Sequence, residues 1–123
     1  MKITDIDHVQ LAMPPGEEDK ARAFYGGVLG LSEQAKPENL AKRGGAWFGE
    51  GNLKIHLGVE IDFRPARKAH PAFNVEGLRE LRAQCEAAGY ETIDDEPLQG
   101  YDRFYVHDPF GNRIEFLEPR GIG

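Results

Sequence analysis

The sequence predicts an α+β protein built from two βαβββ modules whose strands form one cup-shaped mixed sheet. Three observations lead to this prediction. The 123 residues, 40% of them hydrophobic and 29% charged, have the size and composition of a single domain. The two halves of the chain repeat the order strand, helix, strand, strand, strand. Three histidines and one glutamate fall on strand faces that no helix is expected to cover. We therefore expect one domain over residues 1–123, with module one at about 1–60 and module two at about 68–119.

The first module opens with a strand over Ile6–Ala12, in which polar and apolar residues alternate. A helix follows over Glu17–Tyr25, because the acidic residues of its first turn favour the positive end of the helix dipole. This helix ends near Gly30, a residue that suits a left-handed C-cap. Three strands complete the module: Leu31–Ala35, Gly45–Gly49 and Asn52–Val59.

The second module repeats this order after a connector at Asp62–Lys68. It opens with a strand over Ala69–Val75. The helix at Glu76–Gln84 then has Leu78, Leu81 and Cys85 spaced as one buried stripe, and it ends near Gly89. Cys85 is accordingly interpreted as a buried structural thiol. Three further strands are predicted: Glu91–Asp94, Arg103–His107 and Asn112–Glu118.

The alternation of side chains along the strands places four metal-binding residue types on the helix-free faces: His8, His56, His70 and Glu115. His8 corresponds to His70 in the repeat, and His56 corresponds to Glu115. Imidazole and carboxylate groups bind divalent Fe, Mn, Co, Ni or Zn, and this set leaves coordination positions open for a substrate. Each of these side chains alone would more often be an ordinary hydrogen-bonded or solvated group. Their equivalent positions in a repeat favour a metal site.

Composition excludes several other classes of function. The formal net charge of -6 argues against a nucleic-acid-binding protein, which needs a basic surface. No apolar run is long enough to span a membrane. One cysteine cannot form an internal disulfide, so we expect a reducing, cytoplasmic location.

Trp47 is predicted to line the cup, with core packing as its alternative.

The chain resembles the vicinal oxygen chelate superfamily. This superfamily includes glyoxalase I, extradiol dioxygenases, fosfomycin resistance proteins, methylmalonyl-CoA epimerase and bleomycin resistance proteins. The resemblance covers nearly the whole chain. It is most specific at the helix end, where Phe24-Tyr25 precedes Leu29-Gly30-Leu31, and at the run Asp108-Pro109-Phe110-Gly111-Asn112-Arg113-Ile114-Glu115. It also includes the strands around His8, His56 and His70. These motifs indicate a fold much better than a reaction.

The resemblance implies roles for individual residues. His8, His70 and Glu115 match the metal ligands of fosfomycin resistance proteins, and His56 stands where glyoxalase I has a glutamate. Tyr105 matches a pocket tyrosine and is the candidate catalytic residue, with Arg103 on the same strand face. Gln10 and Lys54 stand where fosfomycin resistance proteins have a pocket threonine and tryptophan. Gln10, Trp47, Lys54 and Arg103 are the candidate substrate-binding residues.

Two functions remain open at this stage. The first is a metal-dependent enzyme acting on a small oxygen-bearing substrate, by dioxygenase, lyase, isomerase or thiol-transfer chemistry. The second is a ligand-binding or resistance protein of the bleomycin-binding type, whose relatives lack the metal ligands. The missing glutamate at position 56 argues against glyoxalase I activity. The resemblance also implies a homodimer, because members this short often combine modules from both subunits.

Overall fold

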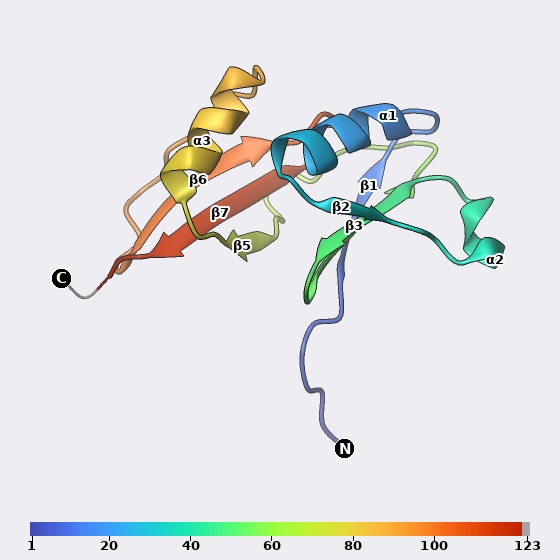
Figure 1. Ribbon diagram of the computed structural model, residues 1–123, viewed down its shortest axis with the longest axis horizontal. Helices are drawn as coiled ribbons and strands as arrows, with labels where there is room; N and C mark the ends of the chain where they lie inside the picture. Colours follow the sequence, from blue (N-terminus) through green and yellow to red (C-terminus); the bar gives the residue numbers. More distant parts are fainter. Residues whose placement is uncertain (122–123) are drawn as a thin grey trace. The chain divides into compact units, whose positions relative to one another are not determined.

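The computed structural model describes residues 1–121 and divides the chain into two compact units. Unit 1 covers Met1–Arg64, and unit 2 begins at Pro65. Each unit has its own sheet with its helix packed on one face (Figure 1). No helix in the described part of the chain is long and apolar enough to cross a membrane.

Unit 1 contains a four-stranded sheet in the order β1-β4-β3-β2. Strand β1 pairs in parallel with β4, whereas the other neighbours are antiparallel. The elements in chain order are β1 (Val9–Met13), α1 (Glu18–Ala21), the π-helix η1 (Arg22–Val28), β2 (Ser32–Gln34), α2 (Glu38–Ala41), β3 (Ala46–Glu50) and β4 (Leu53–Val59).

Unit 2 contains a three-stranded sheet in the order β5-β7-β6. Strand β5 pairs in parallel with β7, and β6 and β7 form an antiparallel hairpin. The elements are β5 (Ala72–Asn74), α3 (Leu78–Ala87), β6 (Tyr101–His107) and β7 (Arg113–Pro119). Helix α3 packs on β6 and β7, with Leu78 and Cys85 buried. Burial raises the pKa of the Cys85 thiol to about 11, which fits a structural thiol and not a nucleophile.

The first helix of unit 1 winds as a π-helix after Ala21. The amide of Leu29 donates to the carbonyl of Phe24, five residues earlier, over 2.9 Å. The glycines at 26 and 27 place little side-chain bulk in this wide turn. Phe24 and Tyr25 are both fully buried although they are adjacent, and the Tyr25 ring stacks on Phe48 of β3 at 5.5 Å. The wide turn therefore directs two consecutive aromatic rings into one core.

The hairpin between β6 and β7 is held by the buried carboxylate of Asp108. Its Oδ1 accepts hydrogen bonds from the amides of Phe110 (2.9 Å) and Asn112 (2.8 Å), and its Oδ2 accepts one from the Asn112 side chain (2.9 Å). Gly111 adopts a φ of 92°, a conformation that a side chain would strain. The sequence motif therefore fixes the turn that starts β7 at Arg113.

The predicted elements differ from the structure at several places. The segment Glu91–Asp94 is not a strand, because only Ile93 pairs with the sheet, through a single bridge to Tyr105. The predicted strands at Ile6–Ala12 and Ala69–Val75 begin later, so His8 and His70 precede β1 and β5. Helix α2 was not predicted. Polar and apolar residues alternate in the three mispredicted strand segments, but too few of their backbone groups find partners to extend the ladders.

The pairing register repeats in the two units. In unit 1, Gln10 of β1 and Trp47 of β3 lie opposite His56. In unit 2, Ala72 of β5 and Tyr105 of β6 lie opposite Glu115. His8 stands two residues before Gln10, and His70 stands two residues before Ala72. The predicted correspondence of His8 with His70, and of His56 with Glu115, is therefore confirmed by the register.

The start of α3 is capped from β7, and this contact can be tested. The Glu118 carboxylate accepts hydrogen bonds from the amides of Gly77 (3.0 Å) and Leu78 (3.2 Å). We expect Glu118→Ala to lower the free energy of unfolding by about 1 kcal/mol, since it removes both bonds and a charge at the helix N-terminus. Urea denaturation gives the value, with Glu91→Ala as an exposed control. Equal losses in the two variants would contradict the cap.

Candidate functional site

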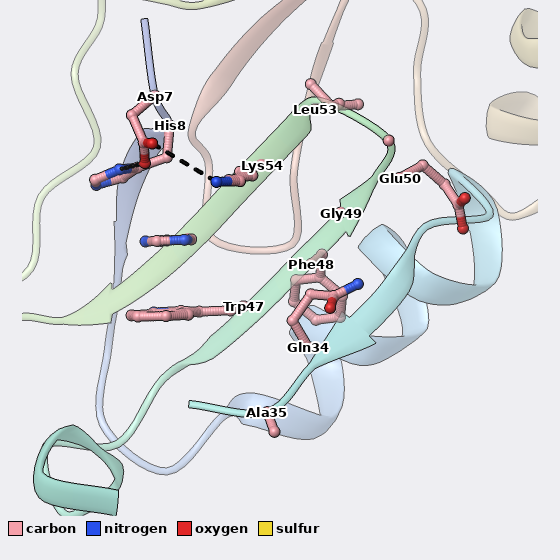
Figure 2. A pocket seen from close by; sticks show the side chains of 12 residues that line it. Asp7, His8, Gln34, Ala35, Trp47, Phe48, Gly49, Glu50, Leu53 and Lys54 are labelled. Carbon is pink, nitrogen blue, oxygen red and sulfur yellow. Dashed lines mark hydrogen bonds and ion pairs between the residues drawn. The ribbon is translucent and has the colours of Figure 1, made fainter. Parts of the chain in front are cut away.

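Unit 1 presents a column of three aromatic rings on the helix-free face of its sheet. The Trp47 indole lies flat against the His56 ring, with centroids 3.9 Å apart and an angle of 3° between the planes. The other face of His56 stacks on His8, with centroids 4.2 Å apart and an angle of 20°. Figure 2 shows Trp47 of β3 and His8, which precedes β1, extending in the same direction on either side of β4. The strand register explains this column, because Trp47 lies directly opposite His56.

His8 is oriented by the residue before it. Its Nδ1 lies 3.0 Å from the Asp7 carboxylate, which also pairs with the Lys54 ammonium at 3.6 Å (Figure 2). The hydrogen bond from His8, followed by the charge of Lys54, lowers the pKa of Asp7. An ionised carboxylate only accepts hydrogen bonds, so Nδ1 of His8 carries the proton. Nε2 of a neutral His8 ring therefore has its lone pair available for a metal ion.

His56 is a buried histidine of unit 1, with 8% of its surface exposed. Burial is the main cause that lowers its pKa, and the neighbouring His8 adds to this effect. The His56 imidazole is therefore neutral at neutral pH. Within residues 1–121 it makes ring contacts and no hydrogen bond.

A groove of about 470 Å³ adjoins the ring column in unit 1. Its volume suits a small organic molecule. Lys54 contributes a half-exposed cation, and Trp47 contributes an aromatic face. Gln10 shares the strand face of His56 but does not line this groove, because its side chain packs over the backbone of Gly58. The lining residues are Asp7, His8, Gln34, Ala35, Trp47, Phe48, Gly49, Glu50, Gly51, Leu53, Lys54 and His56.

Unit 2 brings His70 and Glu115 into direct contact. Nε2 of His70 lies 3.0 Å from Oε1 of Glu115, and Nδ1 of His70 lies 2.9 Å from the carbonyl oxygen of Lys68. A carbonyl oxygen only accepts, so Nδ1 carries a proton. Nε2 of the neutral ring and the carboxylate then direct lone pairs at each other, and this arrangement needs a cation between them. That cation is either a second proton on His70 or a metal ion.

Glu115 is held in place by Arg103 and Tyr105. The guanidinium Nη1 of Arg103 lies 3.3 Å from Oε2 of Glu115 and 2.9 Å from the Tyr105 hydroxyl. Burial acts to raise the pKa of Glu115, but hydrogen bonds from His70, Arg103 and Tyr105 outweigh it and lower the pKa. Burial, followed by the Glu115 charge, raises the pKa of Tyr105, so the phenol keeps its proton. Glu115 is therefore a buried, ionised carboxylate.

The donor chemistry of these two pairs fits a divalent metal ion. His8 and His70 both donate a hydrogen bond from Nδ1 to an oxygen atom. Metal-binding histidines are usually oriented in this way, which leaves Nε2 for the ion. Nε2 of His70 and Oε1 of Glu115 are 3.0 Å apart. Two ligands that are each about 2.1 Å from one ion have this separation when they subtend a right angle at the ion. Within residues 1–121, no three metal-binding side chains gather in one cluster.

Three neighbours of these candidates were missed by the sequence analysis. Asp7 was not among the candidates. It contacts His8 although the two residues are adjacent, because both precede β1, where strand alternation does not apply. The Lys68 carbonyl carries no signal in the sequence. Arg113, whose guanidinium lies 4.2 Å from the centre of the Tyr105 ring, shares the face of Glu115 by alternation and could have been included.

Comparison with known proteins agrees with this repeated architecture. The family model of the Glyoxalase/Bleomycin resistance protein/Dioxygenase superfamily matches residues 5–116. The chain belongs to this superfamily. A crystal structure of a protein assigned to the glyoxalase family from Bacillus anthracis is 53% identical, covers 98% of each chain and has a TM-score of 0.93. The predicted fold class and family are thereby confirmed. No curated protein matches the sequence.

More distant solved structures share the fold. The fosfomycin resistance protein FosX from Listeria monocytogenes is 19% identical, with a TM-score of 0.77 over 97% of this chain and 96% of the other. A glyoxalase/dioxygenase from Nostoc punctiforme is 20% identical, with a TM-score of 0.78 over 95% and 92% of the two chains. At these identities the likeness supports the architecture and no particular reaction.

The pairing of Arg103 with Glu115 leads to a prediction for stability. In the metal-free protein, Arg103→Met should lower the free energy of unfolding by about 2 kcal/mol at neutral pH, because it removes a charged hydrogen bond from a buried carboxylate. The lowered pKa of Glu115 stabilises the fold above its ordinary value of 4.5, and this contribution is lost as the pH falls through the lowered pKa. The effect of the substitution should therefore shrink in acid.

Urea denaturation at neutral pH and below pH 4.5 measures this difference. Arg113→Met is the matched control, since Arg113 contacts the Tyr105 ring and not the Glu115 carboxylate. A loss for Arg103→Met that is the same at both pH values would contradict the predicted pairing.

Proposed function

We propose that this protein is a metal-dependent enzyme of its superfamily, with His8, His70 and Glu115 as ligands of a divalent Fe, Mn, Ni, Co or Zn ion. The observation that carries the proposal is the contact between Nε2 of His70 and the Glu115 carboxylate, with Nδ1 of His70 held by the Lys68 carbonyl. His8 has the equivalent position in the repeat and the same orientation of its ring nitrogens. Two imidazoles and one carboxylate leave coordination positions open for a substrate.

The bound ion would supply Lewis-acid stabilisation of negative charge on substrate oxygens. The remaining groups of the chain favour a small, oxygen-bearing, negatively charged substrate. Arg103 and Lys54 provide positive charge on the two helix-free faces, and Trp47 provides an aromatic contact. Gln10 can offer an amide that both donates and accepts.

Tyr105 is the proposed catalytic residue. Its hydroxyl accepts a hydrogen bond from Arg103, and its raised pKa keeps the phenol protonated at neutral pH. A protonated phenol beside a ligand can donate a hydrogen bond or a proton to a substrate oxygen as charge develops there. Dioxygenase, lyase, isomerase and thiol-transfer reactions all develop such charge. We therefore propose a reaction in which negative charge develops on adjacent oxygens of the substrate and is stabilised by the site.

We further propose that the protein is a homodimer located in the cytoplasm. The segment before β1 extends away from the sheet of unit 1 (Figure 1). Ile3 and Ile6 of this segment are 89% and 80% exposed. Burying these two side chains against a second copy would stabilise the pair through the hydrophobic effect. The single cysteine, which is buried, is compatible with a reducing compartment.

Metal binding tests the enzymatic proposal directly. The protein without a histidine tag should bind close to one divalent ion per chain, as measured by isothermal titration calorimetry with Co²⁺, Ni²⁺, Mn²⁺, Fe²⁺ and Zn²⁺. Glu115→Ala should weaken binding by at least about a hundredfold, because it removes a charged ligand. Glu91→Ala, an exposed glutamate in the same unit, should bind as the parent does. If the parent binds none of these ions, the ligand-binding alternative of the bleomycin type is favoured instead.

The proposed dimer is tested by mass in solution. Light scattering should give twice the mass of one chain, and the double substitution Ile3→Asp and Ile6→Asp should shift the mass toward one chain, since it places charge in an apolar contact. Lys2→Asp adds an acid to the same segment without removing an apolar side chain and should leave the dimer intact. A monomeric parent would refute the dimer.

A further inference from the structure

The ring column of unit 1 offers an explanation for His56, the residue that stands where glyoxalase I has a metal-binding glutamate. His56 lies in β4, and its strand neighbours place Gln10 on one side and Trp47 on the other. It is 8% exposed and is covered on one face by the Trp47 indole at 3.9 Å. Its ring is thus fixed by the sheet and by packing.

His8 is held much less firmly. It precedes β1, its side chain is 40% exposed, and its polar partner Asp7 is 75% exposed. Fixing such a side chain costs conformational entropy. The His8 ring also stacks on the face of His56, with the ring centroids 4.2 Å apart. The favourable energy of an aromatic stack offsets this entropy cost.

The same geometry argues against a shared ion. An imidazole binds a metal ion through a nitrogen lone pair, which lies in the plane of the ring. The His8 and His56 rings lie almost parallel, with 20° between their planes and 4.2 Å between their centroids. An ion in the plane of the His8 ring therefore lies well outside the plane of the His56 ring. The two stacked imidazoles cannot both direct a lone pair at one ion.

We propose that His56, supported by Trp47, is a positioning residue that holds the His8 imidazole ready for metal binding by stacking against it, and is not itself a ligand of that ion. This inference rests on the proposed metal site. In this role His56 acts through the face of its aromatic ring, whereas a ligand would act through a ring nitrogen.

The test compares two substitutions at His56 that separate the ring from its nitrogens. His56→Phe keeps an aromatic face for His8 but has no metal ligand, and His56→Ala removes both. The affinity for Co²⁺, measured by isothermal titration calorimetry, should stay within about threefold of the parent for His56→Phe. It should fall about tenfold for His56→Ala, the loss expected from one stacking contact. The visible absorption spectrum of bound Co²⁺ should be unchanged in His56→Phe, because its ligands are unchanged.

Trp47→Leu provides a second variant that leaves every candidate ligand in place. It removes the ring behind His56 and should weaken Co²⁺ binding several-fold, while His8→Ala should weaken it by about a hundredfold as loss of a ligand. Thermal unfolding of each metal-free variant shows whether it folds. If His56→Ala does not fold, Trp47→Leu and His56→Phe decide the question.

Equal losses of affinity in His56→Phe and His56→Ala would overturn the inference and make His56 a ligand. Parent-like affinity in both His56→Ala and Trp47→Leu would also overturn it, because stacking would then contribute nothing. A parent that binds no divalent ion, or a Glu115→Ala variant that binds as the parent does, would refute the proposed function itself. Loss of affinity in Glu115→Ala together with parent-like affinity in His56→Ala and Trp47→Leu would refute the positioning role alone.

Discussion

The candidate site depends on the parallel pairing of the first and last strands within each unit. Strand β1 pairs with β4, and β5 pairs with β7. Because the paired strands run in the same direction, a residue just before the first strand lies near the face of a residue in the middle of the last. His8 thereby reaches His56, and His70 reaches Glu115. The pairs are separated by nearly fifty residues of sequence and are joined by the ladder.

The two units use this shared geometry for different chemistry. In unit 1 the residue on the last strand is His56, and contact is made through ring faces. In unit 2 the equivalent residue is Glu115, and contact is made through hydrogen bonds and charge, with Arg103 as counterion. A duplicated backbone has thus acquired an aromatic column in one copy and an ionic network in the other. The difference follows from one residue at the centre of each last strand.

The fold, and the residues on the helix-free strand faces, could be predicted from the sequence. The alternation of side chains and the repeat of about sixty residues are both patterns that the sequence shows directly. Strand limits were less predictable. His8 and His70 lie outside the ladders, and Glu91–Asp94 makes only one bridge, because pairing depends on partners distant in the chain. The π-helix and the Lys68 carbonyl depend on backbone geometry, which side-chain patterns do not encode. The ring column could not be predicted, since alternation gives a face but not the angle between two rings.

The position of the two histidines outside the ladders has a consequence for how such a protein can diverge. The backbone of Glu115 and His56 is tied into central strands, whereas His8 and His70 stand where few ladder hydrogen bonds depend on the residue chosen. Substitution at the strand entrances would therefore change the donor groups of the proposed metal site while the sheet stays folded. On the proposed assignment, a single replacement at His8 or His70 would remove one donor group and leave the sheet intact. A backbone of this kind therefore separates the residues that hold the sheet together from the residues that set the chemistry of its face.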